Sequence, residues 1–67
     1  MAAIELQIRL KELHAERLLA SSEGLAADTA YMADLDDEIA EVSDAYVGAA
    51  VTEIATLRAE LFGPQVD

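Results

Sequence analysis

Residues 31–61 read YMADLDDEIAEVSDAYVGAAVTEIATLRAEL and combine an apolar stripe with many acids. The apolar residues recur in steps of three and four, which places them on one side of an α-helix. They are Met32, Leu35, Ile39, Val42, Tyr46, Ala50, Ile54, Leu57 and Leu61. The acids on another side form the predicted acidic face: Asp34, Asp37, Glu38, Glu41 and Asp44. Such a helix buries its apolar face and exposes its acids.

The end of this helix is clear, but its first residue is open. Phe62-Gly63-Pro64 ends it, because glycine suits a C-terminal cap and proline cannot continue a helix. Acceptable N-terminal starts are Asp28, Thr29 and Asp34. We therefore predict a second helix over about 27–62, which begins between Ala26 and Asp34, followed by a tail over 63–67.

The start of the chain carries two conflicting patterns. A strand-like alternation is formed by Ile4, Leu6, Ile8 and Leu10. Over a longer window, Leu6, Leu10, Leu13 and Arg17 follow helical spacing, and the residue types favour a helix. An isolated strand would also have nothing to pair with. The sequence therefore predicts a first helix over about 3–22, whose broad apolar arc contacts more than one neighbour, and a Ser- and Gly-containing turn over 21–26.

These elements predict an all-α fold, with residues 1–67 forming one antiparallel helical hairpin. A chain of 67 residues without cysteine has no disulfides and no thiolate metal sites. One seam between two helices is a small core, and small chains often complete theirs with a partner. We expect self-association, giving a dimeric four-helix bundle. The residues expected to mediate it are Leu35, Ile39, Val42, Tyr46, Gly48, Ala50, Ile54, Leu57 and Leu61.

Gly48 stands out in the small-residue segment VGAAV, residues 47–51. A glycine inside a helix costs about 1 kcal/mol relative to alanine. Gly48 either lets another helix backbone approach closely or is a tolerated weak point, and the sequence leaves both open. The apolar spacing also changes here from a heptad to an eleven-residue unit, which locally unwinds a supercoil.

The charge balance limits the choice of partner. The net charge is −10, and no lysine or arginine occurs between Arg17 and Arg58. Such a charge disfavours direct contact with nucleic acid or an anionic membrane. The longest charge-free run, residues 45–52, is far shorter than the ~20 residues of a membrane span. The N-terminal residues lack the pattern of a secretory signal, so we expect a cytoplasmic protein.

No constellation of residues predicts chemistry. His14 lacks the Glu-x-x-His pattern of di-metal bundles, because Lys11 occupies the position of the glutamate. The acids of residues 34–38 lack the glycine and the alternation of a calcium loop. Tyr31 and Tyr46, four helical turns apart, suit the edge of a core or a protein interface. We predict no enzymatic activity, no metal and no cofactor.

The segment AYVGAAVTEIATLRAEL, residues 45–61, is closed by Gly63-Pro64 and resembles the C-terminal half of small acidic proteins encoded by actinobacteria and their phages. The resemblance spans about residues 31–65 and contains no site motif, so it assigns no functional residue. It implies a small cytosolic accessory protein, such as one that a phage makes to act on a host protein.

Three functions fit these features. The leading prediction is a non-enzymatic interaction module that regulates or inhibits a protein with a basic surface through the acidic face. The alternative is a structural oligomer, such as a scaffold or assembly factor, in which the acids provide solubility. A further alternative is a nucleic-acid mimic that occupies the basic groove of a DNA-binding protein.

Overall fold

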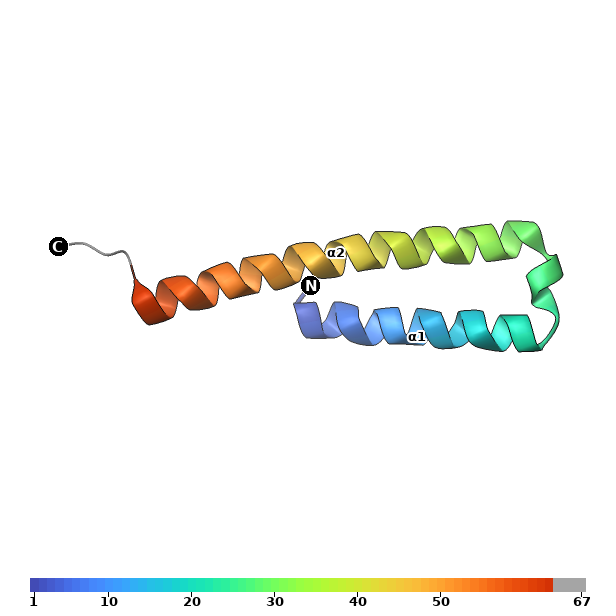
Figure 1. Cartoon of the computed structure of the whole chain (residues 1–67), viewed down its shortest axis with the longest axis horizontal. Coiled ribbons are helices and arrows are strands. Elements are labelled where there is room, and N and C mark those ends of the chain that lie inside the picture. The colour runs from blue at the N-terminus through green and yellow to red at the C-terminus, as the bar shows by residue number, and fades with distance from the viewer. Residues whose placement is uncertain (64–67) are drawn as a thin grey trace.

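The computed structural model describes residues 1–63, which form a hairpin of two long helices (Figure 1). Helix α1 spans Ala3–Ser22, a short 3₁₀ helix η1 spans Leu25–Ala27, and helix α2 spans Thr29–Phe62. The described part of the chain contains no strand, so the predicted all-α hairpin is confirmed. Residues 64–67 of the predicted tail lie outside the described residues.

The turn between the helices depends on Gly24. Its φ of +84° lies in the left-handed region, which glycine adopts without steric cost. The Gly24 N–H donates to the carbonyl of Ser21 at 3.2 Å, and the Glu23 N–H donates to that of Leu19 at 3.0 Å. These bonds satisfy carbonyls at the end of α1 and turn the chain into η1.

Asp28 determines where α2 begins. Its side-chain Oδ1 accepts a hydrogen bond from the Tyr31 N–H at 3.0 Å, which satisfies a backbone donor at the first turn of the helix. Thr29 is the first helical residue. The structure thus selects the Asp28–Thr29 start from the alternatives that the sequence left open, and Asp34 lies within the helix.

The core is one narrow seam between α1 and α2. Three of its four buried side chains lie at seven-residue intervals on α1, namely Leu6, Leu13 and Ala20, and the fourth is Leu35 on α2. Leu13 is fully buried. Half-buried residues extend the seam along α2: Tyr31, Met32, Ile39, Val42, Tyr46, Ala49 and Ala50. Most side chains therefore face outward.

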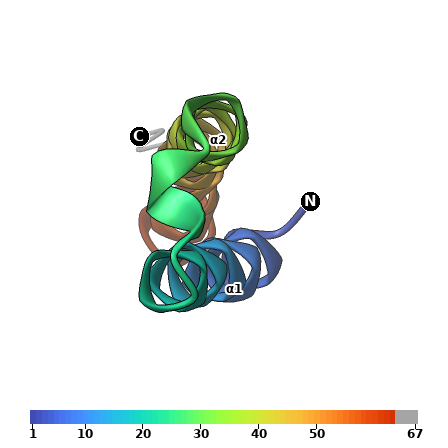
Figure 2. The same ribbon diagram turned by 90° about the vertical axis from the view of Figure 1, so that its right-hand side faces the viewer.

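The hairpin is a slender rod. Its principal extents are 62 × 16 × 13 Å. Viewed from the turn, the two helices lie side by side and no third element covers their outer faces (Figure 2). Large apolar side chains are consequently exposed on both helices, among them Ile4, Ile8, Leu18, Leu19, Val47, Val51, Ile54, Leu57 and Leu61. A single copy does not cover the apolar surface that this sequence carries.

The two helices differ in length, and α2 extends past the start of α1 (Figure 1). The backbone N–H of Ala3 donates to Oε2 of Glu53 at 2.5 Å, which places the beginning of α1 beside this residue. We call residues 54–62, which continue beyond Glu53, the overhang. Every residue of the overhang is exposed.

Gly48 is not at a close helix contact within the hairpin. The residue is exposed, and a Cβ added there would meet no atom within 4 Å outside the backbone of its own helix. Of the two possibilities that the sequence left open for Gly48, a close approach therefore does not occur between α1 and α2. The reason is that the seam follows Val42, Tyr46 and Ala49, and Gly48 lies on another side of α2.

This open position yields a first prediction. Gly48→Ala should raise the free energy of unfolding by up to about 1 kcal/mol, because alanine loses less backbone entropy than glycine in a helix and meets no obstacle here. Thermal melts followed by circular dichroism measure the change. A lower melting temperature for Gly48→Ala would instead indicate that another copy or a partner packs against Gly48.

Candidate interaction surfaces

The predicted acidic face divides into an open part and a paired part. Asp34, Asp37, Glu41 and Asp44 are exposed on α2. Glu38 is half-buried, and its carboxylate forms an ion pair with Arg9 of α1. Four of the five predicted acids are therefore exposed to solvent, whereas Glu38 also takes part in the contact between the helices.

A second ion pair joins the helices through a residue outside the predicted set. Arg17 Nε lies 2.6 Å from Asp36 Oδ1, and a second guanidinium nitrogen lies 3.4 Å from the other carboxylate oxygen. The hydrogen bond from Arg17 and the nearby positive charge hold the pKa of Asp36 below its usual value. Both side chains are substantially exposed, so the pair contributes little to stability.

Sequence reasoning missed both cross-helix pairs because it considered the acids only against their own helix. The cross-helix pairs could have been predicted from how far each residue lies from the turn along the chain. Arg17 and Asp36 stand at similar distances on either side of η1, so an antiparallel hairpin brings them together. The bases of α1 thereby neutralise Asp36 and Glu38, and Asp37, Glu41 and Asp44 remain without an ion pair among residues 1–63.

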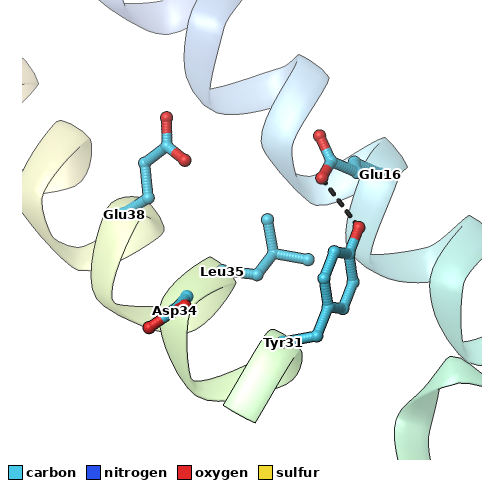
Figure 3. A pocket seen from close by; sticks show the side chains of 5 residues that line it. All are labelled: Glu16, Tyr31, Asp34, Leu35 and Glu38. Carbon is cyan, nitrogen blue, oxygen red and sulfur yellow. Dashed lines mark hydrogen bonds between the residues drawn. The ribbon is translucent and has the colours of Figure 1, made fainter. Parts of the chain in front are cut away.

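A shallow recess lies between the helices near the turn (Figure 3). Its volume is about 120 Å³, and it is lined by Glu16, Tyr31, Asp34, Leu35 and Glu38. The Tyr31 hydroxyl donates to Oε2 of Glu16 at 2.9 Å. This hydrogen bond, aided by partial desolvation, raises the pKa of Tyr31 above its ordinary value. The recess is smaller than the ~300 Å³ or more of typical ligand pockets, and three of its lining residues, Glu16, Tyr31 and Glu38, form polar contacts between the helices.

The other residues singled out in the sequence lie apart. His14 is exposed on α1, as expected for a surface histidine. Tyr31 and Tyr46 are both half-buried at the edge of the seam, which agrees with their predicted position. Within residues 1–63, no group of three or more His, Cys, Asp or Glu side chains is placed so that it could hold a metal ion.

The predicted self-association residues separate into two groups. Leu35 is buried against α1, and Ile39, Val42, Tyr46 and Ala50 are half-buried along the same seam. One chain thus covers much of this stretch by itself. The remaining residues, Gly48, Ile54, Leu57 and Leu61, are exposed in the hairpin.

Two apolar residues that the predicted set omitted, Val47 and Val51, are 56% and 61% exposed. Together with Ile54, Leu57 and Leu61 they form a surface that we call the apolar patch of α2. Phe62, at the end of the same helix, is exposed as well. The predicted apolar stripe contained Ile54, Leu57 and Leu61 but omitted Val47 and Val51, because these two valines lie outside the side of α2 on which the stripe was defined.

No family model, curated protein or solved structure matches this chain. The resemblance to small acidic proteins of actinobacteria and their phages therefore stays a prediction. Neither α1 nor α2 has both the length and the apolar character needed to cross a bilayer, as far as residues 1–63 show.

Proposed function

We propose that this protein is a non-enzymatic interaction module that binds a basic protein surface through the acids of α2. The observation that carries the proposal is the uneven neutralisation of the acidic residues. Asp36 and Glu38 are paired to arginines of α1, whereas Asp37, Glu41 and Asp44 project from α2 with no ion pair among the described residues.

The physical basis of such binding is electrostatic. With a net charge of −10 and a row of unpaired carboxylates, the protein attracts a positively charged partner over a distance and orients it. The row runs along the surface of a long helix, away from any pocket, so it suits a protein partner better than a small molecule. The class of role that fits is regulation or inhibition of the bound protein in the cytoplasm.

The scaffold remains the second candidate, and the exposed apolar patch of α2 favours it. In a scaffold the unpaired acids keep an elongated oligomer soluble and bind nothing. A nucleic-acid mimic is the third candidate; it shares the acidic face, needs charges spaced like phosphates over a longer track, and would bind a DNA-binding protein. Capture experiments from lysate separate the three.

The test neutralises the unpaired acids and leaves the ion pairs intact. We expect the triple variant Asp37→Asn/Glu41→Gln/Asp44→Asn to lose the captured partner, because association becomes slower and less dependent on salt once the attracting charges are gone, while its helicity is unchanged. Stability should be equal or slightly higher, because like charges at helical spacing repel by a few tenths of a kcal/mol. Capture at low and high salt, with circular dichroism of each variant, provides the readout.

A matched control changes the net charge by the same amount at other exposed acids. Glu12→Gln/Glu23→Gln/Glu60→Gln removes three carboxylates that take no part in either cross-helix pair. This control should retain the partner. Equal binding by both triple variants would support the scaffold, and a DNA-binding protein among the captured proteins would support the mimic.

A further inference from the structure

The apolar patch of α2 is symmetric about Ile54. Val51 and Leu57 stand three residues to either side, and Val47 and Leu61 stand seven residues to either side. An antiparallel copy of the same helix, aligned at Ile54, therefore sets Val47 against Leu61, Val51 against Leu57 and Ile54 against itself. A two-fold interface requires this reciprocity: if residue i of one copy contacts residue j of the other, then residue j of the first copy contacts residue i of the second.

The helix α1 does not occupy the space that such a copy needs. The start of α1 reaches Glu53, as the hydrogen bond from Ala3 shows. Val47 and Val51 lie within the accompanied part of α2, yet each is more than half exposed. They consequently face away from α1. Ile54 and Leu61 lie next to their side of the helix along the overhang, and Leu57 lies at the edge of this surface, on the side of α2 that α1 covers nearer the turn. This surface therefore has room for a second helix without displacing α1.

Charge decides between the two possible directions of the second copy. A parallel copy would place the acidic faces side by side and Arg58 beside Arg58. The antiparallel copy sets Arg58 opposite Ala50, Glu53 opposite Ala55 and Glu60 opposite Gly48, so no like charges meet. It also separates the two Ile39 positions by roughly 45 Å of helix at 1.5 Å per residue. That distance exceeds the Debye length of about 10 Å at 0.1 M salt, so the acidic faces no longer repel each other strongly.

The contact is large enough for a specific pair. If the ten apolar side chains of two patches lose their exposed surface, the interface buries on the order of 1,000 Å² in total, which is the lower end for specific protein contacts. We propose that the apolar patch of α2 binds a second copy of this chain in an antiparallel, two-fold dimer centred on Ile54. This proposal concerns a surface other than the acidic face, and it does not depend on the proposed function.

Mass measurement of two matched variants tests the surface. In Ile54→Glu a new carboxylate meets its own copy at the two-fold axis, so we expect the dissociation constant of the dimer to rise by more than about tenfold. Leu18→Glu makes the same change on exposed surface of α1 and should remain dimeric. Sedimentation equilibrium of the wild-type chain should give twice 7.2 kDa. A monomeric wild type, or dissociation by Leu18→Glu and not by Ile54→Glu, would overturn the proposal.

Cysteine cross-linking tests the direction, because the natural sequence has no cysteine. Under mild oxidation, Ile54→Cys should form a disulfide-linked dimer by itself. Val51→Cys mixed with Leu57→Cys should give the mixed dimer in preference to either homodimer. Efficient homodimers of Leu57→Cys would show a parallel arrangement and refute the antiparallel one. The outcome is independent of partner capture, so each proposal can fail without the other.

Discussion

Leu13→Ala should leave most of the chain unfolded at ordinary temperature. Leu13 is the one fully buried large side chain of the described residues, and replacing a buried leucine by alanine costs about 2–5 kcal/mol. Chains of this size rarely obtain more than about 3–5 kcal/mol from a single core. The loss is therefore comparable with the whole stability of the hairpin. Urea titration followed by helical circular dichroism measures it.

The control for this variant is Leu18→Ala, five residues along the same helix. Leu18 is 74% exposed, and surface substitutions of this kind usually change stability by less than about 0.5 kcal/mol. Both variants should be compared at the same chain concentration, because self-association makes apparent stability depend on it. Equal losses for Leu13→Ala and Leu18→Ala would contradict the seam described for a single hairpin.

Gly24→Val should destabilise the turn by about 1–2 kcal/mol. The φ of Gly24 is +84°, where a side chain clashes with its own backbone and a β-branched one does so most severely. No neighbouring atom lies within 4 Å of an added Cβ, so the cost comes from backbone strain alone. Thermal melts of the variant beside the wild-type protein give the value.

Gly24→Asn separates strain from a general effect of adding a side chain. Asparagine adopts the left-handed region more readily than other non-glycine residues, so this variant should lose clearly less than Gly24→Val. If the two variants lost the same stability, the left-handed backbone at Gly24 would not be the cause. If neither lost any, the turn would not contribute to the stability of the hairpin.

Much of the fold could be predicted because its signals are local. Helical spacing and the Gly24 turn gave the bounds of α1, and Phe62-Gly63-Pro64 gave the end of α2. The start of α2 could not be chosen, because Asp28, Thr29 and Asp34 all suit an N-terminal cap. In the structure Asp28 follows η1 directly, and its carboxylate accepts from the Tyr31 N–H, so the helix begins at Thr29.

The candidate surfaces were harder to predict because they depend on how the helices are placed against each other. The exposure of Asp37 and Glu41 could be predicted, because the helical period places them on a different side of α2 from its apolar stripe. The pairing of Arg9 with Glu38 depends on the register of α1 against α2. The spacing of residues within one helix gives no information about this register. Gly48 shows the same limit, since a small residue signals a close approach only if another helix passes on that side.

The overhang of α2 has a consequence for how the backbone opens. Amide hydrogens beside Leu13 exchange with solvent only when the seam itself separates, whereas residues 54–62 lie past the start of α1 with every side chain exposed. Short helical segments without a covering layer fray in water. Protection from exchange should therefore fall steeply after Glu53 in an isolated copy. The overhang is thus the part of the rod in which binding of another molecule should raise the protection of the backbone amides most.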